Sequence, residues 1–448
     1  MRLGRASGVC ALLVALSLPG LSRADAGEVS PEKRALPDYD GREASTSTGE
    51  VLLWVPRILL SPLYLVSEFV VRRPLGYLVS AAERAKLPEF LYDLFLFGPN
   101  HQAGILPVAF VDFGFYPSYG LFFFWNDFVP HQDLVVRGSM WDAHWLAGTI
   151  SDRIHLDALT DLTLSASGIR RPDYQFYGLG SDSLHADRSR YGGTRYEGNA
   201  ALELKLAGLS RLTASVGARR VHFHHGDFSR DPTIEEAVAA GRYQLPPGWD
   251  QGYAMLTNQL SLAIDTRKAR PAPGSGLRVE ARLEQLTSLS PSSTPTILRY
   301  GGTIGGFWDL GQNGRVMSLS LATHFADPLR PADIPFTELV ALGGSESMRG
   351  FPLGRLYGRS AAVMTLRYRW PIWIWLDGSI QLALGNVFDA HLGNFSAQRL
   401  RFSGSIGIES VGSPDSSLEI LLGMGSETFE HGGEITSLRV VVGNNRGF

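Results

Sequence analysis

Alternation of apolar and polar residues dominates the chain from about Ile105 onward. One segment shows the pattern plainly, because apolar and charged residues alternate without exception from Leu277 to Glu284. A period of two is the pattern of a β-strand with one apolar and one polar face. Similar alternation recurs in residues 202–206, 260–265, 362–370 and 418–424. The pattern therefore predicts an all-β fold.

The connections between the predicted strands alternate in length. The candidate strands cover residues 103–112, 118–127, 131–140, 142–152, 156–169, 192–206, 210–224, 254–266, 276–287, 296–309, 314–326, 360–371, 376–388, 399–410, 416–426 and 435–445. Connections after residues 224, 326, 388 and 426 are long, and those after 206, 266, 309, 371 and 410 are short. Long loops at one end and short turns at the other are typical of bacterial outer-membrane barrels, whose strand number is even. Merging residues 131–152 into one strand would leave an odd number, so we predict a transmembrane antiparallel β-barrel of about 16 strands.

Charge placement separates a barrel from a soluble β-sandwich, which would alternate as well. Charges confined to one face, as in residues 278–284, favour a wet interior opposite a lipid-facing surface. Charged residues make up only 19% of the chain, and glycine is abundant at 50 residues. The net charge of −3 offers no basic surface for nucleic acid. We therefore expect outer-membrane lipid, and not nucleic acid, as a partner.

The residues before the strands divide into three segments. Residues 1–26 begin with Arg2 and Arg5, continue with a short apolar run and end in an Ala-Asp-Ala site, which predicts a signal peptide and Sec export. Residues 27–50 are polar and predict a flexible lead-in. Residues 51–102 are apolar and then amphipathic, which predicts short helices at the periplasmic face or in the barrel mouth, with an inner-membrane tether as the competing interpretation. Residues 103–448 would form the barrel.

A loop motif two-thirds of the way along the strands is the most specific feature. Residues 342–351 read Leu-Gly-Gly-Ser-Glu-Ser-Met-Arg-Gly-Phe, so that Gly343 and Gly344 precede Arg349, Gly350 and Phe351. This stretch resembles the sixth extracellular loop of the BamA/TamA family of outer-membrane barrels, the bacterial surface antigen type.

Three further motifs extend the resemblance to about residues 103–448. Residues 265–276 are similar to the family's Asp-x-Arg turn with proline and glycine. Gly385, Asn386 and Phe388 resemble the end of its thirteenth-strand motif. The chain ends in Phe448, like many barrels that the barrel-assembly machinery recognises during biogenesis.

The resemblance implies that the loop folds into the barrel lumen and that Arg349 pairs with an inward acidic residue. A guanidinium in a restricted lumen is costly unless acceptors satisfy its donors. This chain has Ala383 where the family's strand motif has its acid. We therefore expect another carboxylate or backbone carbonyls to hold Arg349. The candidate lumen residues are Asp265, Glu280, Glu284, Arg367 and Arg369.

The function implied by the resemblance is outer-membrane biogenesis, in which a protein or lipid passenger is inserted or translocated with the help of the loop and a weak lateral seam. Residues 27–102 lack the βααββ pattern of a POTRA module and are too few for more than one, so the resemblance is to a member lacking POTRA modules. The alternative is a passive channel or structural surface barrel that retains only the scaffold.

Enzymatic and metal chemistry are not expected. The only cysteine, Cys10, lies in the predicted signal peptide, which excludes disulfides and thiolate sites from the mature chain. No Gly-x-Ser-x-Gly elbow or phosphate loop occurs. The cluster of His222, His224, His225 and Asp227 lies at a predicted strand end, where we expect no metal. We accordingly predict no enzyme activity, cofactor or metal.

Overall fold

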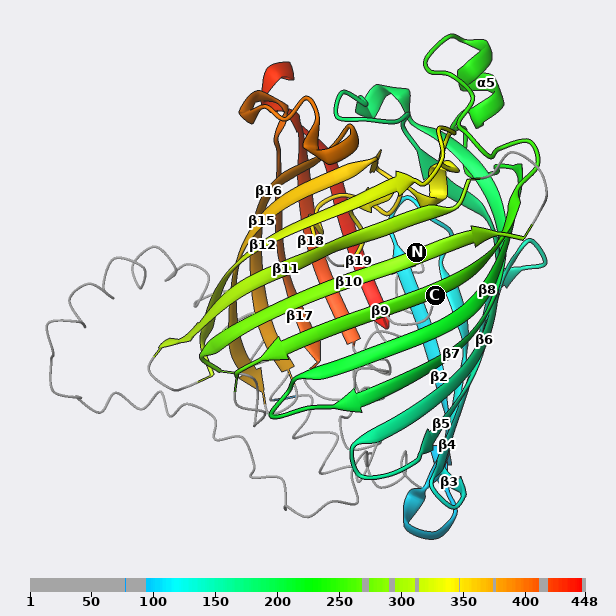
Figure 1. Ribbon diagram of the computed structural model, residues 1–448, viewed down its shortest axis with the longest axis vertical. Coiled ribbons are helices and arrows are strands. Elements are labelled where there is room, and N and C mark those ends of the chain that lie inside the picture. Colours follow the sequence, from blue (N-terminus) through cyan, green and yellow to red (C-terminus); the bar gives the residue numbers. More distant parts are fainter. Residues whose placement is uncertain are drawn as a thin grey trace, which may run out of the picture.

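Sixteen antiparallel strands form a closed barrel (Figure 1). The computed structural model describes Tyr77 and residues 94–444 without 268–273, 290–294, 311–313, 346, 374–375 and 411–417. The barrel strands are β2 (Ala103–Asp112), β3 (Ser118–Val129), β4 (Gln132–Asp142), β5 (Trp145–His155), β6 (Thr160–Phe176), β7 (Ser189–Lys205), β8 (Arg211–His225), β9 (Tyr253–Asp265), β10 (Gly276–Ser288), β11 (Ile297–Asp309), β12 (Val316–Pro328), β15 (Ser360–Trp373), β16 (Leu376–Phe388), β17 (Arg401–Ser410), β18 (Leu418–Thr428) and β19 (Ile435–Asn444). The predicted all-β class and the number of strands are confirmed.

The strands follow the predicted segments closely, with one informative difference. A turn at residues 143–144 separates β4 from β5, as the even strand number required. Strand β6 starts later than predicted and continues to Phe176, where it pairs with Ser189 of β7. Residues 170–176 bury Asp173 and Gln175 and so do not alternate simply between apolar and polar. Periodicity could not reveal this extension.

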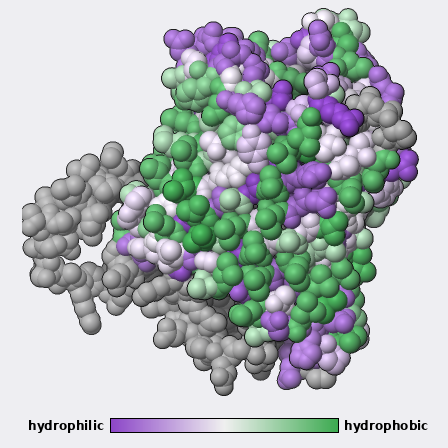
Figure 2. Space-filling model, in the orientation of Figure 1, coloured by the Kyte–Doolittle hydropathy of each residue, from purple (hydrophilic) through white to green (hydrophobic). Residues whose placement is uncertain are grey.

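Outward-pointing apolar side chains cover the middle of the barrel wall. Leu121, Ile304 and Leu422 are 57%, 54% and 50% exposed. Figure 2 shows hydrophobic side chains across the middle of one face, with hydrophilic ones gathered towards its two ends. An apolar surface of this size is favourable in contact with the hydrocarbon of a membrane and unfavourable in contact with water. Among the described residues, no helix is long and apolar enough to cross a membrane.

The two ends of the barrel differ as the loop lengths predict. Turns such as 130–131, 156–159 and 206–210 lie at one end. Loops 177–188, 226–252 and 329–359 lie at the other, which is at the top of Figure 1. Loop 226–252 carries helix α5 (Ile234–Ala239), which begins with a capping box between Thr233 and Glu236.

Loop 329–359, between β12 and β15, enters the lumen at the long-loop end. It contains the short helix η5 (Phe336–Glu338) and a hairpin of β13 (Val340–Leu342) and β14 (Leu356–Gly358). Phe336 is fully buried among rings from β6, β7, β8, loop 226–252 and β14, namely Phe176, Tyr191, Phe223, Trp249 and Tyr357. This apolar cluster packs loops 226–252 and 329–359 against the barrel wall.

A short strand precedes the barrel. β1 (Leu96–Phe97) pairs with Gly104 and Ala103 of β2. Those two residues pair on their other side with Phe124 and Trp125 of β3, so β1 occupies the opposite edge of β2. The predicted signal peptide 1–26, the lead-in 27–50, most of segment 51–102 and the terminal Phe448 lie outside the described residues.

Candidate functional site

The tip of loop 329–359 bends sharply beyond the β13–β14 hairpin. Gly343 and Gly344 have φ values of +108° and +83°, which favour glycine. The N–H of Gly344 donates to the carbonyl of Phe351 at 2.9 Å, and the N–H of Phe351 donates to that of Met348 at 3.0 Å. These bonds close a compact turn that presents Arg349 and Gly350 to the barrel wall.

Gly350 lies directly on the inner face of β18. A Cβ atom at this position would overlap the carbonyl oxygen of Met424, so no other residue fits without movement of the loop. The N–H of Gly350 donates to Ser403 Oγ at 2.9 Å, and Ser437 Oγ donates to its carbonyl at 3.1 Å. Phe351 is fully buried over Gly425. The loop motif is therefore bonded to β17 and β19 and packed on β18.

Arg349 is buried and faces two carboxylates of adjacent strands. It forms an ion pair with Glu419 of β18 and lies 3.8 Å from Glu409 of β17. Glu409 also pairs with Arg367 of β15. Because a buried guanidinium is costly without acceptors, these carboxylates hold Arg349 against the wall.

The carboxylates expected beside Arg349 lie elsewhere, which corrects the sequence prediction. Asp265 pairs with Arg267 at 2.5 Å, and Glu280 pairs with Arg278. Glu284 lies 3.3 Å from Arg282 and 3.6 Å from Arg299. All three acids are on β9 and β10, far around the sheet from β17 and β18. Alternation shows which side chains point inward but not which wall the loop tip reaches.

The remaining predicted residues have structural partners. Arg369 lies 3.4 Å from Asp377. Asn386 Nδ2 donates to the carbonyls of Ser181 and Arg399, and so joins β16 to two outer loops. Gly385 faces the carbonyl of Ala362, where a Cβ would lie at 2.6 Å. Among the described residues, no group of three or more His, Cys, Asp or Glu is arranged to hold a metal ion.

The first and last strands meet over a short seam. Val441, Val442 and Gly443 of β19 pair with three residues of β2, Asp112, Val111 and Phe110. One more backbone bond joins the N–H of Phe113 to the carbonyl of Val440 at 2.9 Å. Below this seam β1 takes the same edge of β2 at residues 103–104. Within the described part of the chain, residues 105–109 pair with neither β1 nor β19 on that edge.

Arg439 links the loop to both sides of the seam. It stands on β19, is buried, and donates from Nε and Nη2 to the Asp112 carboxylate of β2 at distances of 2.8–3.2 Å. Its Nη1 donates to the carbonyls of Gly344 and Arg349. One guanidinium thus contacts the first strand, the last strand and the loop tip. Sequence reasoning missed Arg439, Asp112, Glu409 and Glu419, although the inward place of Glu419 was visible in the alternation of β18.

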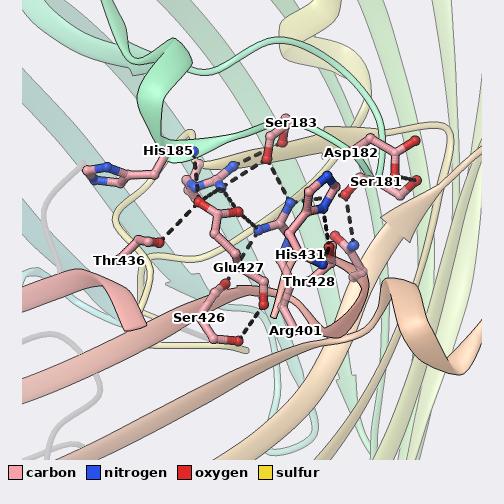
Figure 3. A network of polar contacts seen from close by, with 12 residues as sticks. Ser181, Asp182, Ser183, His185, Arg401, Ser426, Glu427, Thr428, His431 and Thr436 are labelled. Atoms are coloured by element: carbon pink, nitrogen blue, oxygen red, sulfur yellow. Dashed lines mark hydrogen bonds and ion pairs between the residues drawn. The ribbon is translucent and has the colours of Figure 1, made fainter. Parts of the chain in front are cut away.

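A second polar network closes the long-loop end (Figure 3). Glu427 of β18 accepts from the guanidinium groups of Arg355 and Arg401, both fully buried. The same carboxylate accepts from the N–H of His185 at 2.8 Å and from Thr436 Oγ1 at 3.1 Å. The carboxylate therefore ties loops 177–188 and 329–359 to β17, β18 and β19.

Glu338 is a third buried anchor of the loop. It accepts from Arg219 and Arg299 at 3.0 Å each and from the hydroxyl of Tyr253 at 2.6 Å. Burial opposes the charged form, but the two arginines outweigh it and hold the pKa of Glu338 below its ordinary value. Loop 329–359 is thus fixed by charged pairs at both its base and its tip.

Comparisons with known proteins agree with this architecture. A model of the Omp85 superfamily domain matches residues 161–410, more than half of the chain. The fold resembles the crystal structure of BamA from Haemophilus ducreyi lacking POTRA domains 1-3, with a TM-score of 0.54 and 15% identity over 77% of this chain and 70% of that chain. CdiB from Escherichia coli gives a TM-score of 0.51 and 12% identity over 78% of this chain and 64% of that chain.

The chain thus spans less than two thirds of CdiB. Comparison with curated protein sequences finds no significant match. The family match covers β6 to β17 together with loop 329–359, and the barrel has the strand order and internal loop described above. The chain therefore belongs to the Omp85 superfamily and is an outer-membrane β-barrel of the BamA type.

Proposed function

We propose that this barrel is Sec-exported to the outer membrane and assists the insertion or translocation of a passenger, most simply a protein, through its lateral seam. Arg439 supports this proposal more than any other residue, because it contacts the seam and the internal loop together. Movement of the loop would withdraw two of its acceptors, and parting of the seam would withdraw the third. The two motions are therefore coupled through one guanidinium.

The seam is the interface that opens at least cost. Among the described residues the seam has three residue pairs, whereas β11 and β12 have thirteen. Each backbone hydrogen bond contributes about 0.5–1.5 kcal/mol net, so parting β2 from β19 costs several-fold less than parting any long strand pair. A strand edge exposed in this way can pair with an incoming chain.

A passive channel is the alternative that the same fold could serve. The apolar cluster around Phe336 and the networks of Glu338 and Glu427 occupy the long-loop end of the lumen. A diffusion channel needs a continuous polar passage, so these side chains favour passenger handling. Steady single-channel conductance in planar bilayers would support the alternative.

A reversible lock on the seam tests the proposal. Val111 and Val442 are direct partners, so V111C with V442C places two thiols across the seam. L262C with A281C is the matched control across β9 and β10, which share eleven pairs. In cells that depend on this protein, oxidation of the seam pair should lower the outer-membrane or secreted level of the passenger, reductant should restore it, and the control pair should have no effect.

The passenger itself is identified by crosslinking. A photoreactive residue at Ala109, on β2 next to the last described pair of the seam, should capture the passenger in cells, and mass spectrometry should identify it as a nascent barrel or exported protein. The same probe at Leu262 should not. Normal passenger levels with a fully locked seam would contradict the proposal.

A further inference from the structure

Three glycines lie side by side on the outer face of the barrel. Gly138 of β4 pairs with Gly148 of β5, and Gly148 pairs with Gly168 of β6. Leu121 and Tyr196 flank the three glycines in this row. They are 57% and 59% exposed, so the glycines face outward with them. Three missing side chains in one row leave the wall hollowed.

The hollow is a groove of about 770 Å³. Its floor is glycine backbone, and its sides are mainly apolar. The large side chains around it are Tyr119, Leu121, Met140, Leu146 and Tyr196. All five are at least 40% exposed. On a lipid-facing wall, such an apolar groove allows hydrocarbon to lie against the strands.

Arg170 lines one end of this groove and gives it a polar limit. It pairs with Leu146 in the row next to the glycines, on the side of the 143–144 turn. Arg220 follows Tyr196 in the glycine row on β8. Both guanidinium groups are exposed, and within the described residues neither has a hydrogen bond or an ion pair with protein.

The position of the arginines along the strands matters for their energy. The 143–144 turn belongs to the long-loop end of the barrel, so both lie towards that end of the wall. An arginine on the lipid face is costly at the middle of a bilayer and tolerated near an interface. Phosphate oxygens are the bidentate partner that a free guanidinium prefers.

We propose that this groove binds an anionic, phosphate-bearing lipid of the leaflet that faces the long loops. One acyl chain lies over Gly138, Gly148 and Gly168, and the phosphate is held by Arg170, with Arg220 beside it. A second protein barrel fits less well, because the apolar contact would leave both charges without a partner. The proposal depends on the barrel lying in a membrane and is independent of passenger transport.

Filling the groove and removing the charge are separate tests. A Cβ at Gly138 meets no atom within 4 Å, so G138L should fold and occupy the groove. Gly198 is equally open and does not line the groove, so G198L is its matched control. R170Q removes the charge, and R211Q is its control, because Arg211 is exposed at the short-turn end of β8.

The measurement uses the full chain in nanodiscs of phosphatidylcholine doped with diphosphorylated lipid A, with bound lipid counted by native mass spectrometry. We expect R170Q to lower lipid A retention about fivefold, the equivalent of about 1 kcal/mol for one arginine near a charged surface. G138L should lower it at least as much, and both controls should retain it. Equal retention by all variants would overturn the proposal, and so would a change in oligomeric state by G138L without loss of lipid.

Discussion

Single residues decide where the internal loop rests. Gly350 can touch β18 because it has no side chain, and this contact brings Arg349 to Glu419. The pair is buried, so each charge compensates the cost of burying the other. Either charge alone in this place would strongly destabilise the fold. Arg439 depends in the same way on Asp112 and on loop carbonyls.

Removal of Arg349 should therefore destabilise the folded barrel through the carboxylate left behind. We expect R349A to cost about 3–5 kcal/mol, the usual range for breaking a buried ion pair. The double variant R349A/E419Q should recover part of the loss, because Glu419 is then neutral. The measurement is the midpoint of heat-modifiable mobility in detergent, with R211A as an exposed control. An R349A midpoint equal to that of the parent would mean that the arginine does not contribute to the stability of the barrel.

At the scale of elements, the strands differ in how firmly they are joined. In the part of the chain that the structure describes, β9 and β10 share eleven pairs, whereas β19 and β2 share three. Amide exchange is slow where backbone bonds are many and buried, and fast where few must break. The seam and the loop that Arg439 links to it should consequently form one unit of low local stability.

Loss of Asp112 should loosen that whole unit. In D112N the guanidinium of Arg439 loses a charged acceptor, so amides in residues 343–351 and 435–440 should exchange faster, while those of β9 and β10 stay unchanged. Hydrogen–deuterium exchange with mass spectrometry measures this. D327N is the matched control. Asp327 forms an ion pair with Arg359, with 2.8 Å between the two groups, and this pair lies away from the seam. Acceleration confined to residues next to position 112 would refute the coupling.

At the scale of the whole molecule, two buried ion-pair networks and an apolar cluster close the long-loop end of the barrel. Glu338 and Glu427 each accept from two arginines and together fasten loop 329–359 to the wall and to loop 177–188. Buried networks of this kind hold one arrangement only while every member keeps its charge. Their stability is therefore sensitive to pH.

Acid should release loop 329–359. The pKa of Glu338 lies below its ordinary value of 4.5, so its stabilising contribution is complete above that value and is lost as the pH falls through the lower, folded-state pKa. Limited proteolysis with an acid-active protease should accordingly cut this loop faster below pH 4.5 than at neutral pH. In E338Q the acid-dependent increase should shrink. A cleavage rate independent of pH in the parent would contradict this assignment.

Much of this protein was determined by the sequence itself. The period of two, the alternation of loop lengths and the even strand number were sufficient for the all-β class and the 16 strands, because a wall between lipid and water imposes its pattern on every strand. The loop motif indicated a loop folded into the lumen, and Arg349 is found buried there.

Only the tertiary structure decided which strands meet the loop. Asp265, Glu280 and Glu284 were as plausible in sequence as Glu409 and Glu419, since each of the five directly follows an apolar residue of a strand. Closure of the barrel brings β17, β18 and β19 beneath the loop tip. It also pairs β2 with β19, although these strands are more than three hundred positions apart in the sequence. Contacts across a closed sheet depend on register and curvature, which local alternation does not contain.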